Sequence, residues 1–236
     1  ATTEDILSTQ GEREIRLHRK GGKVTHDKLT GDLCLVLDAW LHRAGIVTRR
    51  SYTRAMNGIV VLSVGGDALA GPESVRAVAR HLADEQDSGH QVVSVLHASR
   101  DTREELLGLA HAVSPMPDPR ELDMLVTTGA RISCALCAIA LIDQGRRAVS
   151  LTGSQAGIIT DTRHGEATVV DVRSARIRSA LDDGAIVLVA GSQGVSTDLE
   201  VTALPESAAD TTAAALATAL GGTHVVYLHP SRAQVR

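Results

Sequence analysis

A glycine pair that follows a short apolar run is the first feature of the sequence that could do chemistry. Val64 is followed by Gly65, Gly66 and Asp67, and a segment with helical periodicity begins near Pro72. Glycines between a strand and a helix let backbone N–H groups approach an anion, and the helix N-terminus adds partial positive charge. The pattern is typical of a phosphate-binding turn, although the same glycines also occur in ordinary tight turns.

The cysteines and histidines do not form a recognisable metal site. Cys134 and Cys137 have C-x-x-C spacing, but they lie among Ala, Leu and Ile, and no second pair stands at zinc-ligand spacing. We interpret them as buried small side chains and predict no metal. The ten histidines are scattered along the chain. His97, which ends an apolar run, and His164, in a polar loop, are interpreted as structural or exposed.

The elements that must position these residues alternate regularly from Gly58 onward. Apolar runs predict strands at residues 59–64, 92–96, 148–151, 168–172 and 186–190. Helical periodicity between them predicts helices at residues 73–88, 102–113, 120–144, 174–182 and 208–220. Continuous apolar strands separated by long helices indicate an α/β fold with a mostly parallel sheet that is covered on both faces.

The first 57 residues differ from the rest in charge. They carry ten basic against seven acidic residues, whereas the whole chain has a net charge of −4. Residues 9–28 are polar and are interpreted as a loop or a disordered arm. Residues 30–44 show apolar positions at helical spacing, with Thr30 placed as the cap. We therefore expect an N-terminal basic arm with a helix over residues 1–57 and a main domain over residues 58–236.

Composition restricts the classes of partner. The chain has 236 residues, of which 43% are hydrophobic and only 1% aromatic. Nucleic-acid binding is not expected, because single-stranded nucleic acids are bound on aromatic platforms. No uninterrupted apolar run approaches the roughly 18 residues of a membrane span, and no export pattern opens the sequence. The expected location is the cytoplasm, with which three cysteines in mostly apolar surroundings agree.

Longer motifs resemble those of the aspartokinases. Residues 119–133 read Pro-Arg-Glu-Leu-Asp-Met-Leu-Val-Thr-Thr-Gly-Ala-Arg-Ile-Ser, and residues 151–157 and 187–195 match as well. Residues 209–213, Ala-Asp-Thr-Thr-Ala, complete an order and spacing that hold from about Gly58 to Tyr227. The resemblance implies the amino-acid kinase fold, a three-layer αβα sandwich. In that family ATP phosphorylates aspartate, with glycine-rich turns, a lysine and Mg²⁺ stabilising the phosphates.

Several of the family's catalytic positions are replaced here. Ser63 stands where the family has its first lysine, and Asp67 stands where a hydroxyl follows the glycines. The glutamate before Arg131 is an alanine, and the arginine and both glycines that precede Asp210 are lost. No lysine follows Lys28. We also expect the domain to lack the family's nucleotide lobe and regulatory ACT domains.

These replacements lead to the expectation that aspartate phosphorylation has been lost, because each missing charged group typically costs about 10²–10³ in rate. The pocket would then serve small-molecule binding or acid/base chemistry, for instance in specialised metabolism. Asp67 and Asp210, if they converge, would share a proton. The candidate catalytic residues are Asp67, Asp210 and Arg131, and the candidate substrate-binding residues are Gly65, Gly66, Thr128, Ser154, Gln155 and Thr211.

Two other functions remain open at this point. The chain could be a non-catalytic scaffold or regulatory subunit of another enzyme, or an ATP-dependent aspartate kinase after all. No cofactor is expected under the first two hypotheses, and ATP with Mg²⁺ is required only under the third. The expected partner is a small-molecule ligand, and a second copy of the chain or another protein is left open as a further partner.

Overall fold

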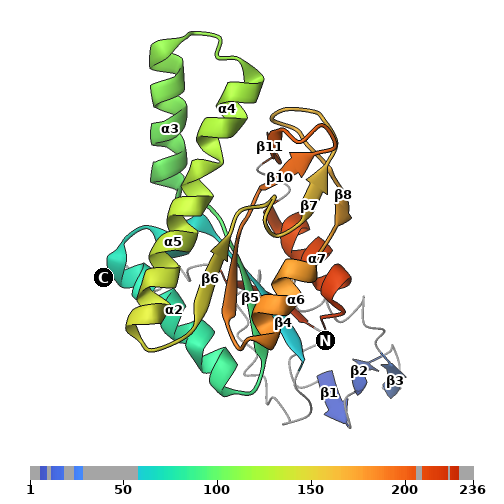
Figure 1. The fold of residues 1–236 in the computed structure, drawn as a ribbon. Helices are drawn as coiled ribbons and strands as arrows, with labels where there is room; N and C mark the ends of the chain where they lie inside the picture. The colour runs from blue at the N-terminus through green and yellow to red at the C-terminus, as the bar shows by residue number, and fades with distance from the viewer. Residues whose placement is uncertain are drawn as a thin grey trace. The chain divides into compact units, whose positions relative to one another are not determined.

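A computed structural model gives the fold of the chain (Figure 1). It describes residues 58–205, 209–222 and 224–228, and the backbone of three short strands near the N-terminus. The chain divides into two compact units, Ala1–Ala55 and Met56–Arg236.

The N-terminal unit contains an antiparallel sheet of the order β1-β2-β3. Its strands are β1 (Ile6–Thr9), β2 (Glu12–His18) and β3 (Val24–Lys28). The prediction of a loop over residues 9–28 is therefore wrong. Ile15 and Leu17 alternate with charged neighbours, which is the period of a strand, and the high charge content concealed it. The helix expected at residues 30–44 lies outside the described residues.

The main sheet of the second unit has the order β12-β4-β5-β9-β6 among the described strands. All of its neighbouring pairs are parallel, as predicted. The strands are β4 (Ile59–Val64), β5 (Gln91–Leu96), β6 (Ala148–Leu151), β9 (Ile186–Ala190) and β12 (His224–Leu228). β4, β5 and β9 are almost completely buried, which explains why their sequences read as continuous apolar runs.

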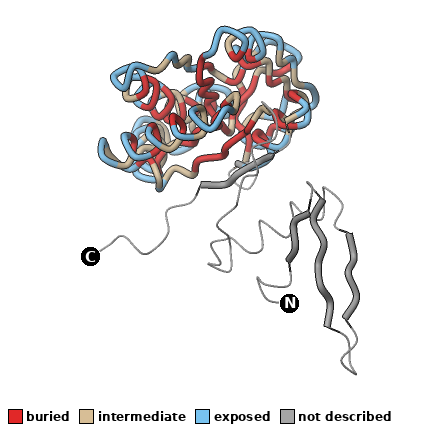
Figure 2. Tube along the Cα trace, turned by 90° about the horizontal axis from the view of Figure 1, so that it is seen from below, coloured by how far each residue is buried: buried red, intermediate tan, exposed pale blue. Residues whose placement is uncertain are grey.

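Helices cover both faces of this sheet and give the expected three-layer α/β sandwich. One face carries α2 (Pro72–Asp87) and α5 (Thr128–Asp143), and the other carries α6 (Ala175–Asp182) and α7 (Ala209–Leu220). Successive strand residues point to opposite faces, so Leu62 packs in the first core and Val61 in the second. Figure 2 shows the buried residues running through the middle of this unit.

A second, smaller sheet has the order β11-β10-β7-β8. Its strands are β7 (Ile158–Thr160), β8 (Val169–Val172), β10 (Gln193–Ser196) and β11 (Val201–Ala203). The prediction that residues 168–172 form a buried strand of the main sheet is wrong, because β8 pairs antiparallel with β7 and buries none of its residues fully. The other three strands have three or four residues each and were not predicted.

The helix predicted over residues 120–144 is two helices. α4 (Pro119–Val126) ends at Thr127, and α5 begins directly after it. Asp118 caps α4 by accepting the N–H groups of Arg120 and Glu121, and α3 (Arg100–Val113) precedes it.

The continuous stretch Pro119–Asp143 is long and apolar enough to match a membrane span, with a mean hydropathy of 1.9 in its most apolar window. The sequence analysis did not predict this match, because polar residues interrupt the apolar ones along the stretch. Of that window, 44% is buried inside the domain, where α5 contributes Cys134, Cys137 and Leu141 to the first core. Core helices of globular domains pass the same test of length and composition.

Candidate functional site

The connections of the main sheet define a switch point between β5 and β9, which are neighbours. After β5 the chain passes through α3 and α4 to α5, which packs on one face of the sheet. After β9 it passes through β10 and β11 to α7, which packs on the other face. Ligands of open α/β sheets bind outside the carboxyl ends of the strands at such a point.

Four polar residues from four segments meet at this point, and we call them the switch-point cluster: Ser63, His97, Ser192 and Asp210. The Ser63 Oγ donates a hydrogen bond to the Asp210 carboxylate at 3.2 Å and lies 3.4 Å from Nε2 of His97. Nδ1 of His97 lies 3.1 Å from Oγ of Ser192. The cluster is therefore a continuous chain of hydrogen bonds.

The switch-point cluster runs from the interior to the surface. Ser63 is 3% exposed and His97 is 9% exposed, whereas Ser192 is half-buried and Asp210 is exposed. A Cβ atom at Gly191 would lie 2.7 Å from Nδ1 of His97, so the absence of a side chain there makes room for the imidazole. Ser192 itself has a positive φ of 54°, an uncommon conformation for a residue with a side chain.

The predicted phosphate turn lies beside this cluster. A Cβ atom at Gly66 would come within 1.8 Å of the carbonyl oxygen of Ala98, so the loops after β4 and β5 pass too close for any side chain. Asp67, in the short 3₁₀ helix η2 (Gly66–Leu69), is exposed, and its carboxylate lies 3.7 Å from Nε of Arg100. Asp67 and Asp210 thus have different partners, and the structure gives no shared-proton contact between them.

A second group of polar contacts holds Arg131, in the first turn of α5. Its Nε donates to Oε1 of Gln193 at 3.2 Å and its Nη2 donates to Oγ1 of Thr127 at 3.3 Å. Gln193, only 1% exposed, donates in turn to the carbonyl oxygen of Thr127 at 2.8 Å. The hydroxyl of Thr128 donates to the carbonyl oxygen of Leu125 at 2.6 Å, so it closes the last turn of α4.

The turn after β6 contains the remaining predicted residues. The N–H of Thr152 donates to Oε1 of Gln155 at 3.1 Å, and the N–H of Gln155 donates to Oγ1 of Thr152 at 3.2 Å. Ser154, whose Oγ lies 3.0 Å from Oγ1 of Thr152, is exposed like Gln155. Gly153 fits tightly against Gln193, because a Cβ atom there would lie 2.3 Å from its carbonyl oxygen.

The two groups of contacts adjoin at Ser192 and Gln193. These consecutive residues reach His97 and Arg131, respectively. The predicted site residues therefore lie around one edge of the main sheet, at the carboxyl ends of its strands. They come from the turns after β4 and β6 and from the first turns of α5 and α7. Thr211 lies exposed in the first turn of α7, next to Asp210.

Sequence reasoning missed three residues of the site as functional candidates. Ser63 was seen only as a replaced lysine, His97 was interpreted as structural or exposed, and Ser192 was not singled out. Their position in the sequence could have identified them, because each lies at or just after the carboxyl end of a main-sheet strand, where ligands of such sheets bind.

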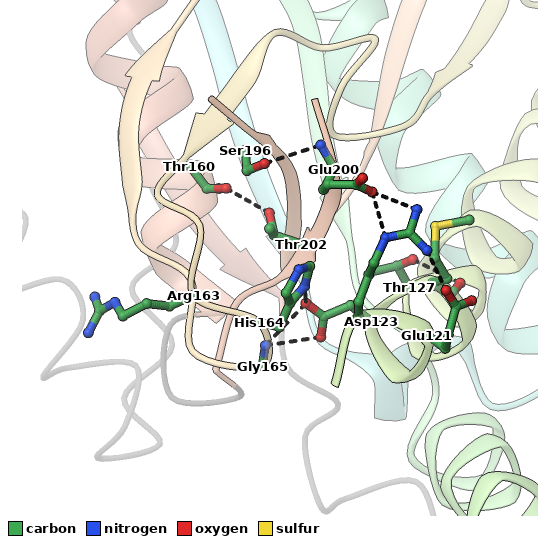
Figure 3. A network of polar contacts seen from close by, with 12 residues as sticks. Glu121, Asp123, Thr127, Thr160, Arg163, His164, Gly165, Ser196, Glu200 and Thr202 are labelled. Carbon is green, nitrogen blue, oxygen red and sulfur yellow. Dashed lines mark hydrogen bonds and ion pairs between the residues drawn. The ribbon is translucent and has the colours of Figure 1, made fainter. Parts of the chain in front are cut away.

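A buried carboxylate links α4 to the second sheet, and we call Asp123, His164 and Gly165 the Asp123 anchor (Figure 3). The Asp123 side chain accepts the N–H of Gly165 at 3.0 and 3.1 Å and Nδ1 of His164 at 2.8 Å. Nε of Arg120 donates to Glu200 at 2.9 Å in the same region. His164 therefore has a structural contact, in agreement with its interpretation from the sequence.

Cys134 and Cys137 are buried free thiols, as predicted. Burial raises the pKa of Cys137 to about 12, and burial together with the neighbouring Cys137 thiol raises the pKa of Cys134. No group of three or more His, Cys, Asp or Glu side chains is arranged for a metal within the part of the chain that the structure describes.

A hollow of about 430 Å³ lies at the amino ends of β6 and β9. It is lined in part by Arg146, Arg147 and Asp183. This end of the sheet is opposite to the switch-point cluster, and none of the predicted site residues lines the hollow.

Comparison with known proteins decides the family. The sequence model of the amino acid kinase family matches residues 58–229. The chain belongs to the amino acid kinase family. Within it, the aspartokinase of Mycolicibacterium smegmatis is 51% identical over 163 residues, which are 69% of this chain and 39% of that protein. The aspartokinase of Corynebacterium glutamicum is 50% identical over the same shares of both chains.

Solved structures agree with this placement in the aspartokinase branch. Aspartate kinase from Synechocystis matches with a TM-score of 0.63 and 33% identity, over 73% of this chain and 28% of that one. Escherichia coli aspartokinase III in complex with aspartate and ADP matches in fold, with a TM-score of 0.63 and 20% identity over 72% of this chain and 48% of that one. The chain spans about two fifths of the length of the curated relatives.

The expectation of a repurposed protein or a non-catalytic scaffold that has lost aspartate phosphorylation is wrong. Curated relatives about 50% identical to this chain are named aspartokinases. The expectation rested on the replaced charged groups, whereas the identity of about 50% extends over 163 residues. Ser63, at the position of the family's lysine, joins a polar network with His97 and Asp210.

Proposed function

We propose that this domain transfers the γ-phosphoryl group of ATP to a carboxylate of aspartate, giving ADP and an acyl phosphate. The observation that carries the proposal is the identity of about 50% to aspartokinases over 163 residues. Support comes from the polar groups that surround the carboxyl ends of the main sheet. Aspartokinase III of Escherichia coli, which shares the fold, binds aspartate and ADP.

Arg131 is the proposed contact for a carboxylate of aspartate. The partners that hold its guanidinium, Gln193 and Thr127, are both neutral, so its positive charge is available to an anion. An ion pair with a carboxylate is stronger than either of these hydrogen bonds. Thr128 and the turn that carries Ser154 and Gln155 are the proposed neighbours of the substrate.

The phosphates are proposed to lie along Gly65, Gly66 and the first turn of α7, where Asp210 and Thr211 stand. One carboxylate oxygen of aspartate attacks the γ-phosphorus, and the bond from that phosphorus to the bridging oxygen breaks to release ADP. The attacking carboxylate is already deprotonated, so catalysis rests on positioning and on electrostatic stabilisation rather than on a general base.

ATP with Mg²⁺ is the nucleotide form that this chemistry requires. Protein sites for Mg²⁺ usually contribute one or two carboxylates and leave the rest to phosphates and water. The exposed carboxylates of Asp67 and Asp210 fit that requirement. The ion supplies neutralisation of the charge that develops on the phosphates.

The proposal includes a small molecule as partner and a cytoplasmic location, where ATP is abundant and the buried thiols stay reduced. Neither a nucleic acid nor a membrane is a proposed partner. A second copy of the chain is the proposed macromolecular partner.

Trapping of the product tests the proposal. The full chain is incubated with ATP, Mg²⁺ and aspartate in the presence of hydroxylamine, which converts an acyl phosphate into a coloured hydroxamate. We expect aspartyl hydroxamate and ADP in equal amounts. Arg131→Gln should raise KM for aspartate about ten- to a hundred-fold, whereas Arg176→Gln on the exposed face of α6 should not change it. The absence of hydroxamate with the unaltered chain would overturn the proposal.

A further inference from the structure

The guanidinium of Arg131 is held by two neutral side chains. Its Nε donates to Gln193 and its Nη2 donates to the hydroxyl of Thr127. We propose that Gln193 is a positioning residue, which fixes the guanidinium of Arg131 and leaves its positive charge available to a carboxylate of aspartate. The identity of the ligand rests on the proposed function, but the binding of aspartate can be measured without catalysis.

The orientation of the Gln193 amide is determined by its partners. Its Nε2 donates to the backbone carbonyl oxygen of Thr127 at 2.8 Å, and a carbonyl oxygen can only accept. Its Oε1 therefore faces the Nε–H of Arg131, at 3.2 Å. The hydroxyl of Thr127 donates to the carbonyl oxygen of Met124 at 3.3 Å, which leaves its own oxygen able to accept Nη2 of Arg131. Each of these donors thus meets an acceptor.

The backbone of Gln193 is fixed from two sides. Gln193 begins β10 and pairs with Ala203 of β11. Its carbonyl oxygen lies so close to Gly153 that a Cβ atom there would come within 2.3 Å of it. Because Gly153 belongs to the turn after β6, Gln193 connects this turn with Arg131 in the first turn of α5. Both turns contain residues that are proposed to lie beside the substrate.

Gln193 is too deeply buried to contact a ligand itself. It is 1% exposed and Thr127 is 4% exposed, whereas Arg131 is half-buried. The guanidinium has more N–H groups than these two acceptors can take, so the others remain for a ligand. Gln193 therefore acts through Arg131 and not on the substrate.

The neutrality of Gln193 is the second part of its role. In the part of the chain that the structure describes, Arg131 forms no ion pair with a carboxylate. A cation that is partly removed from water and has only neutral partners attracts an anion more strongly than a cation that is already paired. A glutamate at position 193 would have nearly the same shape, but it would pair with the guanidinium and compete with the ligand.

Calorimetry with aspartate tests the positioning role, because it measures the dissociation constant Kd in the absence of ATP. Gln193→Glu should raise Kd about ten- to a hundred-fold, since the new carboxylate neutralises Arg131. Gln193→Met removes the hydrogen bonds and adds no charge. It should raise Kd roughly two- to ten-fold, which is the cost of ordering a long side chain only when the ligand binds. Gln144→Glu, the same change at an exposed residue after α5, is the matched control and should leave Kd unchanged.

The affinity for ADP with Mg²⁺ separates positioning from a general loss of structure. Both Gln193 variants should bind ADP as tightly as the unaltered chain, because Arg131 is proposed to contact only aspartate. A merely structural role would weaken the binding of both ligands as Tm falls. An equal Kd for aspartate in Gln193→Glu and the unaltered chain, or an equal weakening for aspartate and ADP, would overturn the inference.

Two further measurements keep the inference falsifiable if the Gln193 variants do not fold. Thr127→Val removes the second acceptor of Arg131 and keeps the carbonyl group that binds Gln193. It should raise Kd for aspartate roughly two- to ten-fold and leave that for ADP unchanged. In the unaltered chain without ligand, the Nε–H of Arg131 should exchange with water more slowly than that of the exposed Arg176. Equal exchange at the two arginines would show that the guanidinium is not held and would overturn the inference.

The outcomes also separate this inference from the proposed function. Aspartate binding that depends on Gln193 in a chain that forms no hydroxamate would support the positioning role and overturn the proposed function. Hydroxamate formation whose KM for aspartate is the same in Gln193→Glu and the unaltered chain would do the reverse. A chain that binds no aspartate would overturn both.

Discussion

The Asp123 anchor and the switch-point cluster each contain an aspartate, but they differ in burial and in the lengths of their contacts. The Asp123 carboxylate is 2% exposed and accepts bonds of 2.8–3.1 Å from His164 and Gly165. Asp210 is exposed, and its cluster is joined by contacts of 3.1–3.4 Å. The anchor is enclosed by the protein, whereas the cluster ends on a carboxylate that is exposed at the surface.

This difference indicates how the chain divides its polar groups between stability and function. A buried carboxylate without its donors is costly, so Asp123 fixes the loop between β7 and β8 on α4. The cluster stands where loops after three parallel strands come together and where water has access. Changes in the anchor should therefore affect folding, and changes in the cluster should affect binding.

The largest expected effect is on the anchor. Asp123→Ala leaves the N–H of Gly165 and the ring of His164 without their acceptor. The expected loss of stability is about 3 kcal/mol, which should lower Tm by roughly 6–12 °C in a domain of this size. Calorimetry measures this shift, and hydroxamate formation by the folded protein should stay unchanged. A change in Tm no larger than that of Asp198→Ala, at an exposed loop residue, would show that the anchor does not stabilise the domain.

A glycine at the edge of the cluster should affect both stability and activity. Gly66→Ala forces a Cβ atom against the carbonyl oxygen of Ala98 and should cost about 1–3 kcal/mol. It should also slow hydroxamate formation, because the turn moves. Gly71→Ala is the matched control, since a Cβ atom there meets nothing within 4 Å and its backbone is extended. Equal Tm values for the two variants would contradict the close packing of the loops after β4 and β5.

A charge change in the cluster should affect activity with little effect on stability. Asp210→Asn keeps an oxygen that can accept from Ser63 but removes a negative charge that is proposed to hold Mg²⁺. We expect the rate of hydroxamate formation to fall about 10²-fold and the stability to change by less than about 0.5 kcal/mol. If the rate is unchanged while Tm falls steeply, Asp210 belongs with the anchor and not with the site.

The smallest effect is expected at the exposed Asp161, near the anchor. The N–H of Thr168, followed by the side chain of Arg163, lowers the pKa of this carboxyl. Its contribution to stability is therefore present above its ordinary range and is lost as pH falls through the lowered value. Asp161→Asn should have a slightly lower Tm than the unaltered chain near pH 7, and the difference should vanish in strong acid. A difference that is constant across the pH range would refute this origin.

Much of the scaffold could be predicted from the sequence, for reasons visible in particular elements. β4, β6 and β9 begin and end where their apolar runs do, because strands of a covered parallel sheet need apolar residues on both faces. β7 and β11 have only three residues each, too few to show the period of a strand, and they are defined by their pairing with β8 and β10. The break at Thr127 between α4 and α5 was missed because the helical periodicity continues across it.

The site could be predicted only where a local motif marks it. Gly66 and Asp210 were found because each stands in a recognisable run. His97 was not, because a lone histidine after a strand has no pattern of its own. Its partners Ser63 and Ser192 are 34 and 95 residues away in the sequence, and only the parallel arrangement of β4, β5 and β9 brings them together.

The most direct test is a crystal structure of the full chain with ADP, Mg²⁺ and aspartate. The account predicts that the phosphates of ADP lie along Gly65, Gly66 and the first turn of α7 and that a carboxylate of aspartate pairs with Arg131. Phosphates bound instead in the hollow beside Arg146 and Arg147, at the opposite end of the sheet, would contradict it.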